Sequence, residues 1–165
     1  MLMCKVHGVQ VWMKSLHDVQ CSHFYHGAFH YPRTPLPMSA LTFRQAVPAD
    51  AERCFEIESI AYEGEEAATL AKIHTRISNY PQGFLVMQTE GKTIGFINSG
   101  CAHAVVMSDE AFKELVGHDP VAPNVVIMSV VIDPAHQGKG YSTLMMRTFV
   151  QHMQALGKKT IHLMC

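Results

Sequence analysis

Two closely spaced glycines, Gly138 and Gly140, are the first feature of the sequence that points to chemistry. They lie in DPAHQGKGYS (residues 133–142), between an apolar run and a segment with helical spacing. Glycines let the backbone come close to another group, and the start of a helix attracts negative charge. Such a loop either binds a phosphate or pyrophosphate or forms a tight turn between strand and helix. Two glycines alone leave both interpretations open.

Two well-known phosphate-binding loops do not fit this stretch. A Walker loop needs Ser or Thr directly after its lysine, but Gly140 follows Lys139 here. A dinucleotide-binding fingerprint needs a third glycine at the position of Thr143. The glycine loop therefore belongs to neither of these classes.

The elements that must position the loop alternate between strand and helix patterns. The run NVVIMSVVI (residues 124–132) is rich in β-branched residues and predicts a central strand covered on both faces. Upstream, the patterns predict a strand over residues 41–47, a helix opened by Pro48 and Asp50, a second helix over about 66–79, a hairpin around the EGK turn and a short helix in SDEAFKELVG. Downstream, a helix is predicted from the spacing of Leu144, Met145, Phe149, His152 and Leu156, and a last strand begins in KKTIHLMC.

The glycine loop resembles the acyl-CoA loop of the GNAT superfamily of N-acetyltransferases. That motif is Gln or Arg, two residues, Gly, one residue, then Gly or Ala. The sequence here reads Gln137-Gly138-Lys139-Gly140-Tyr141-Ser142, in which Ser142 replaces the usual Gly or Ala. The element order of Leu41–Cys165 is also similar to that superfamily. More narrowly, FEIESIAYEGEEAATLAKIHTRISNYPQGFLVMQTEGKTIGFINS (residues 55–99) resembles bacterial relatives of arylalkylamine (serotonin-type) N-acetyltransferase.

The resemblance implies an α/β fold of the GNAT type, with a mixed, mostly antiparallel sheet and flanking helices. It implies acetyl-CoA as cosubstrate, its pyrophosphate held by the loop that Gln137 opens and its pantetheine arm paired with the central strand like an added strand. A backbone N–H near Val130 would polarise the thioester carbonyl, which lies where this strand splays from the last one. The cofactor-binding residues expected on this basis are Val130, Val131, Ile132, Gln137, Gly138, Lys139, Gly140, Tyr141, Ser142 and Thr143.

The implied reaction is transfer of the acetyl group from acetyl-CoA to a primary amine, with small arylalkylamines as one acceptor class. Alternative acceptors are a protein N-terminus and an aminoglycoside, and a non-catalytic acyl-CoA-binding module is the alternative from another functional class. A neutral amine must form before it attacks, so the reaction needs a general base.

The catalytic residues are not assigned by the sequence. Two histidines of the arylalkylamine enzymes correspond to Val126 and Met128, whose side chains do not titrate. The tyrosine that acts as the family's general acid would lie beyond Cys165. The remaining candidates are weak, because each also fits a structural or solvent-facing role; they are Glu63, Glu65, Glu66, His103, Ser129 and His136.

The composition argues against several other classes of function. The chain has 165 residues, 48% of them apolar, and a net charge of −1, which favours one globular domain over a nucleic-acid or membrane-surface protein. Five widely spaced cysteines without a CxxC pair favour free thiols in a reducing compartment. No apolar run approaches the ~20 residues that span a bilayer, so we expect a cytoplasmic protein.

A change in composition near residue 38 predicts two parts. Residues 1–37 hold five of the eleven histidines and end in the proline-rich YPRTPLP, which predicts an extension outside an N-acetyltransferase domain at 38–165. We expect no metal site in CSHFYHGAFH (residues 21–30), because a second ligand pair is missing. The resemblance implies that the C-terminal part of the fold lies beyond Cys165. We therefore expect either a fragment or a partner chain, such as the second copy of a homodimer, covering that side of the sheet.

Overall fold

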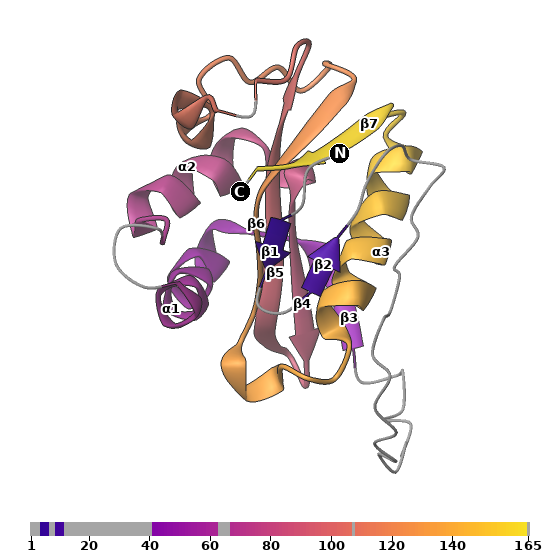
Figure 1. Ribbon diagram of the computed structural model, residues 1–165. Helices are drawn as coiled ribbons and strands as arrows, with labels where there is room; N and C mark the ends of the chain where they lie inside the picture. The colour runs from indigo at the N-terminus through magenta and orange to yellow at the C-terminus, as the bar shows by residue number, and fades with distance from the viewer. Residues whose placement is uncertain (1–3, 7–8, 12–40, 63–66, 107, 165) are drawn as a thin grey trace.

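The computed structural model describes residues 4–6, 9–11, 41–62, 67–106 and 108–164. A five-stranded sheet with strand order β3-β4-β5-β6-β7 forms its centre (Figure 1). All neighbouring strands are antiparallel except β6 and β7, which are parallel. The predicted mixed, mostly antiparallel sheet is therefore confirmed. The strands are β3 (Leu41–Gln45), β4 (Phe84–Thr89), β5 (Lys92–Ala102), β6 (Asn124–Ile132) and β7 (Thr160–Leu163).

Near the N-terminus, β1 (Cys4–Val6) and β2 (Val9–Val11) form a separate antiparallel pair. Most of the predicted extension, including the histidine-rich residues 21–30, lies outside the described residues. None of the described helices is long and apolar enough to cross a membrane.

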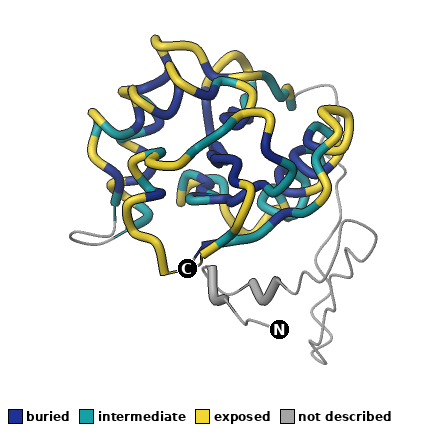
Figure 2. Tube along the Cα trace, turned by 90° about the horizontal axis from the view of Figure 1, so that it is seen from above, coloured by how far each residue is buried: buried dark blue, intermediate teal, exposed yellow. Residues whose placement is uncertain are grey.

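Helices cover both faces of the sheet. The helices α1 (Ala51–Ala61) and α2 (Leu70–Asn79) lie on one face, and α3 (Tyr141–Ala155) lies on the other (Figure 1). Seen from above, buried residues lie mostly toward the middle of the trace and exposed residues mostly at its periphery (Figure 2). Four 3₁₀ helices complete the described elements: η2 (Pro48–Asp50), η4 (Pro81–Gly83), η5 (Glu110–Glu114) and η6 (Pro134–His136).

The start of α2 differs from the prediction. The helix begins at Leu70, about four residues later than expected. Thr69 has an extended backbone and accepts a hydrogen bond from the Lys72 amide at 3.3 Å, so it is the N-cap. The cap fixes the boundary because its hydroxyl satisfies an amide that no helical carbonyl can reach.

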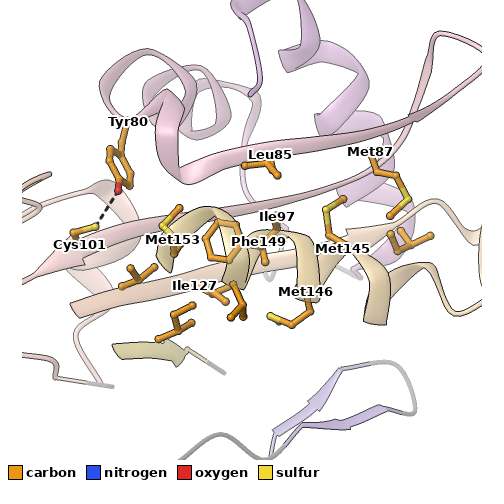
Figure 3. Packing of buried hydrophobic residues seen from close by; sticks show 14 of the residues in the cluster. Tyr80, Leu85, Met87, Ile97, Cys101, Ile127, Met145, Met146, Phe149 and Met153 are labelled. Carbon is orange, nitrogen blue, oxygen red and sulfur yellow. Dashed lines mark hydrogen bonds between the residues drawn. The ribbon is translucent and has the colours of Figure 1, made fainter. Parts of the chain in front are cut away.

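The buried face of α3 also differs in detail from the prediction. Its apolar residues pack on the sheet among Leu85, Met87, Ile97 and Ile127, with Tyr80 and Cys101 at one end of the cluster (Figure 3). Leu156, which was expected on this face, follows the end of the helix and is 44% exposed. The helix residues that are buried are Met145, Met146, Phe149, Val150 and Met153.

The predicted hairpin is confirmed, with β4 and β5 joined through Glu90 and Gly91. Both residues have positive φ angles, 50° and 75°, and Thr89 pairs with Lys92 across the turn. Two left-handed residues match the twist of the flanking strands, which is why a glycine suits this tight connection.

Candidate functional site

The glycine loop joins η6 to α3 with an unusual backbone. Gly138 and Gly140 have φ angles of +75° and +77°, a conformation that side chains disfavour. A Cβ atom built on either glycine would meet no other atom within 4 Å. The glycines are therefore required by the backbone conformation and not by crowding inside the protein. The loop is also exposed, so space remains beside it for a bound group.

The N-terminus of α3 presents free amides beside this loop. Gly140 is the N-cap, it has no side chain to accept hydrogen bonds, and the first helical bond runs from the Leu144 amide to the Gly140 carbonyl at 3.2 Å. The amides of Tyr141, Ser142 and Thr143 therefore have no helical acceptor. Together with the helix dipole, they form a suitable site for a phosphate or pyrophosphate.

The glycine loop is fixed to the rest of the domain at its beginning. Asp133 caps η6 through a hydrogen bond from the Ala135 amide at 2.9 Å, and it forms an ion pair with Arg53 of α1. Gln137, the first residue of the loop motif, donates from Nε2 to the Ile132 carbonyl at 3.1 Å. The side chains of Asp133 and Gln137 thus hold the loop against the end of β6.

One edge of β6 is paired over only the first half of the strand. Its pairing with β7 ends at Ile127, whose carbonyl accepts from the Met164 amide at 2.9 Å. Beyond Ile127, no strand in the described part of the chain pairs with this edge. On the opposite edge, the register with β5 shifts between Ile127 and Ser129. Met128, which lies between them, is therefore an extra residue in a β-bulge.

The backbone of the last β6 residues points alternately to its two edges. The Asp133 amide donates to the Ile94 carbonyl of β5 at 2.8 Å. By the alternation of antiparallel pairs, Val131 bonds to β5 as well, while Val130 and Ile132 face the open edge. Of the three expected β6 residues, Val130 and Ile132 therefore have backbone groups at the open edge, and Val131 does not. The Ile132 carbonyl already accepts from Gln137.

A buried polar cluster lies on the α1 and α2 face of the same strand. Glu58 of α1 is only 1% exposed, and its Oε1 accepts from the Ala68 amide and from the Ser129 hydroxyl, both at 3.1 Å. Arg76 of α2 is 4% exposed and donates to Asn98 Oδ1 at 3.3 Å. Asn98 lies opposite Ser129 in the β5–β6 register. The cluster therefore connects two helices with two strands through charged and polar groups.

Two polar atoms of this buried cluster have no hydrogen-bond partner among the described residues: Glu58 Oε2 and Asn98 Nδ2. Burial raises the pKa of the Glu58 carboxyl, although the Ala68 amide, the Arg76 charge and the Ser129 hydroxyl oppose this effect. Burial lowers the pKa of Arg76, against the charges of Glu58 and Glu114. Sequence reasoning missed Glu58 and Arg76, because a charged residue in an amphipathic helix is usually exposed.

The candidate catalytic residues named from the sequence do not lie together in the described structure. Glu63, Glu65 and Glu66 lie outside the described residues. The His103 side chain is 69% exposed and bonds to Asp119 at 2.8 Å. His136 is half-buried in η6, before the glycine loop. Ser129 is buried on β6 and donates a hydrogen bond to Glu58 at 3.1 Å.

Comparisons with solved structures show the same fold. The loading GNATL domain of CurA from Lyngbya majuscula is 20% identical with a TM-score of 0.63, and the match covers 68% of this chain and 57% of that one. Ard1 from Thermoplasma volcanium is 18% identical with a TM-score of 0.58, covering 75% and 70%. The putative acetyltransferase yncA from Salmonella typhimurium, solved with its cofactor acetyl-CoA, is 22% identical with a TM-score of 0.52, covering 72% and 66%.

The search of curated proteins gave no match. A family model, however, matches residues 45–165, which include β4 to β7, the glycine loop and the described helices α1, α2 and α3. Since this match spans well over half of the chain, the protein belongs to the acetyltransferase (GNAT) family.

Proposed function

We propose that this protein transfers an acetyl group from acetyl-CoA to a primary amine. The observation that carries the proposal is the position of an open glycine loop and the free amides of α3 directly after the unpaired end of β6. Both parts suit one elongated ligand with an anionic group at one end. The loop suits a pyrophosphate and the strand edge suits the amide-containing pantetheine arm.

The residues present fit a CoA-linked donor. The space beside Gly138 and Gly140 is free, and the loop amides of residues 138–143 point to no acceptor that competes for them within the described chain. At the strand, the Val130 amide and carbonyl and the Ile132 amide face the open edge. The Val130 amide is then the donor best placed to polarise a thioester carbonyl. A bound acetyl-CoA would supply the activated acyl group, and the protein would supply position and hydrogen bonds.

For the acceptor, we propose a small amine, with arylalkylamines as the first class to test. The proposal rests on the resemblance of residues 55–99 to bacterial relatives of arylalkylamine N-acetyltransferase. A protein N-terminus and an aminoglycoside are the competing acceptors. The three solved structures described above share the fold at 22% identity or less, so they do not decide between these classes.

Two measurements on the same preparation test this function. Calorimetry with CoA measures binding, and release of the CoA thiol from acetyl-CoA measures turnover with 2-phenylethylamine, an alanine-initiated peptide and kanamycin. We expect binding and preferential turnover of 2-phenylethylamine. Binding without turnover of any amine would support a non-catalytic acyl-CoA-binding module instead, and absence of CoA binding would contradict both.

A further inference from the structure

Glu58 is in an unusual position for a carboxylate. It lies in the interior of the domain, where an ionised carboxylate is costly unless it is fully paired. Its Oε1 receives two hydrogen bonds, but its Oε2 receives none from the described residues, and no ion pair within 4.0 Å joins it to Arg76. Glu58 is therefore a buried carboxylate whose direct partners among the described residues are the Ala68 amide and the Ser129 hydroxyl.

We propose that Glu58, acting through the Ser129 hydroxyl, takes up the proton that the amine loses when it is acetylated. This inference rests on the proposed function and adds the missing proton acceptor. The supporting geometry is a direct contact: Ser129 Oγ donates to Glu58 Oε1 at 3.1 Å from a buried position on β6.

The position of Ser129 on β6 connects this pair to the acyl-transfer region. Ser129 lies between Met128, the bulged residue, and Val130, whose backbone faces the open edge. The Val130 side chain packs in the cluster on the α3 face, whereas the Ser129 side chain, 6% exposed, contacts Glu58 on the α1 and α2 face. In the proposed step, the Ser129 hydroxyl is the group that passes the proton released beside Val130 to Glu58.

The proton and electron balance of the step is simple. The neutral amine attacks the thioester carbon, a C–N bond forms, the C–S bond breaks, and the CoA thiolate leaves with the bonding electrons. The proton on nitrogen moves to Ser129 Oγ while the Ser129 proton moves to Glu58 Oε1. Glu58 is then a carboxylic acid, and it returns to the carboxylate by giving its proton to the thiolate or to solvent.

The groups around Glu58 set its proton affinity. Among the described residues, Arg76 of α2 is the charged group that faces it and Cys54 of α1 is a nearby titratable group, while β5 and β6 contribute the neutral Asn98 and Ser129. Burial raises the Glu58 pKa and the Arg76 charge opposes the rise. A raised carboxyl pKa improves a general base, because the base then holds the proton more strongly at neutral pH.

The test compares Glu58→Gln with Glu52→Gln, an exposed glutamate on the same helix. Glutamine keeps an oxygen that can accept from Ala68 and Ser129 but cannot take up a proton. CoA binding by calorimetry, acetylation of 2-phenylethylamine and the pH dependence of kcat are measured on both variants. We expect E58Q to bind CoA within about twofold of wild type, to lose about 100-fold or more in kcat and to lose the acidic limb of the pH profile. E52Q should match wild type throughout.

Ser129→Ala tests the route separately. It leaves the carboxylate in place and removes the hydroxyl, so we expect a loss of about tenfold or more in kcat with unchanged CoA affinity. An S129A variant with wild-type kcat would overturn the hydroxyl route.

The outcomes separate this inference from the proposed function. If wild type turns over amine and E58Q retains kcat within about threefold with an unchanged pH profile, the inference is wrong and the proposed function stands. If E58Q lowers kcat but keeps the acidic limb, Glu58 has only a structural role, which also overturns the inference. If wild type binds CoA but acetylates no amine, or does not bind CoA, both proposals fail.

Discussion

The two faces of the sheet are built differently, although each is covered by helices. On the α3 face, methionine and phenylalanine side chains pack against aliphatic strand residues. On the α1 and α2 face, an apolar cluster surrounds a carboxylate, a guanidinium, an amide and a hydroxyl. Both faces are well buried, so the difference does not follow from exposure. Buried polar groups weaken a core unless they are fully satisfied, and two atoms of this cluster have no partner among the described residues.

The comparison suggests that the two faces do different work. The α3 face stabilises the domain and fixes the helix whose first turn completes the glycine loop. The polar face has groups that can exchange protons next to the bulge in β6. Substitutions on the first should therefore change stability, whereas substitutions on the second should change stability and chemistry together.

The largest expected effect is on the apolar face. Phe149 is fully buried between α3 and the sheet, so Phe149→Ala should lower the free energy of unfolding by about 4 kcal/mol through lost burial and a cavity. Denaturant unfolding measures this change. Leu156→Ala at the exposed end of the same segment is the control, with an expected change within about 0.5 kcal/mol. Equal losses for both variants would contradict the assignment of the core.

A somewhat smaller effect is expected for Arg76 on the polar face. Arg76→Met removes the charge that faces Glu58 and the donor to Asn98. We expect a loss of about 3 kcal/mol, because Glu58 is left without a compensating charge but can still become protonated. The double variant Arg76→Met/Glu58→Gln should be more stable than Arg76→Met alone. An E58Q effect that is the same in the wild-type and Arg76→Met backgrounds would show that the two groups do not interact.

The next smaller effect is a pH dependence of stability, which we expect from Glu58 on the α1 and α2 face. The pKa of Glu58 is raised by burial above its value in the unfolded chain, so the folded state binds this proton more strongly. The corresponding stability is present below the unfolded pKa and is lost as the pH rises through the folded pKa. The Tm of E58Q minus that of wild type should therefore increase with pH. Thermal melts from about pH 4 to 8 check this, and a difference that falls with pH would reverse the sign of the shift.

The smallest effect is expected at Lys139 in the glycine loop. Its ammonium is exposed and lies 5.9 Å from the Tyr141 ring centroid. Because a solvated charge is screened while the loop amides remain, Lys139→Ala should weaken CoA binding by only about two- to threefold. Calorimetry at two salt concentrations measures the loss, which should shrink at high salt. A loss above about thirtyfold would mean that the lysine, and not the backbone, dominates binding.

Much of the fold follows from local sequence patterns. The apolar run at 124–132 predicted β6 with its observed bounds, and the Gly91 turn predicted the β4–β5 hairpin. The start of α2 was missed because Thr69, its N-cap, lies within a run that is otherwise compatible with a helix. The buried face of α3 was only partly predicted, since Met146 and Val150 are also apolar and the choice between adjacent faces depends on the sheet.

The candidate site divides in the same way. The glycine loop was readable because positive φ angles require glycine and leave a mark in the sequence. The Glu58 cluster was not readable, because its four members come from α1, α2, β5 and β6 and meet only in the folded chain. Likewise, the register with β5 decides that the backbone groups of Val130 and Ile132 face the open edge of β6, whereas those of Val131 face β5.

The central claim is that the glycine loop binds the CoA pyrophosphate through its backbone, and the two ends of α3 provide a matched test. Gly140 precedes the helix with φ +77° and Gly157 follows it with φ +74°, and a Cβ on either meets nothing within 4 Å. Alanine should therefore cost a similar amount of stability, about 1–2 kcal/mol, at both sites. Calorimetry with CoA should show an affinity loss of about tenfold or more for Gly140→Ala, since its methyl group enters the space beside the loop amides, and no loss for Gly157→Ala. Equal CoA affinities of the two folded variants would contradict this claim.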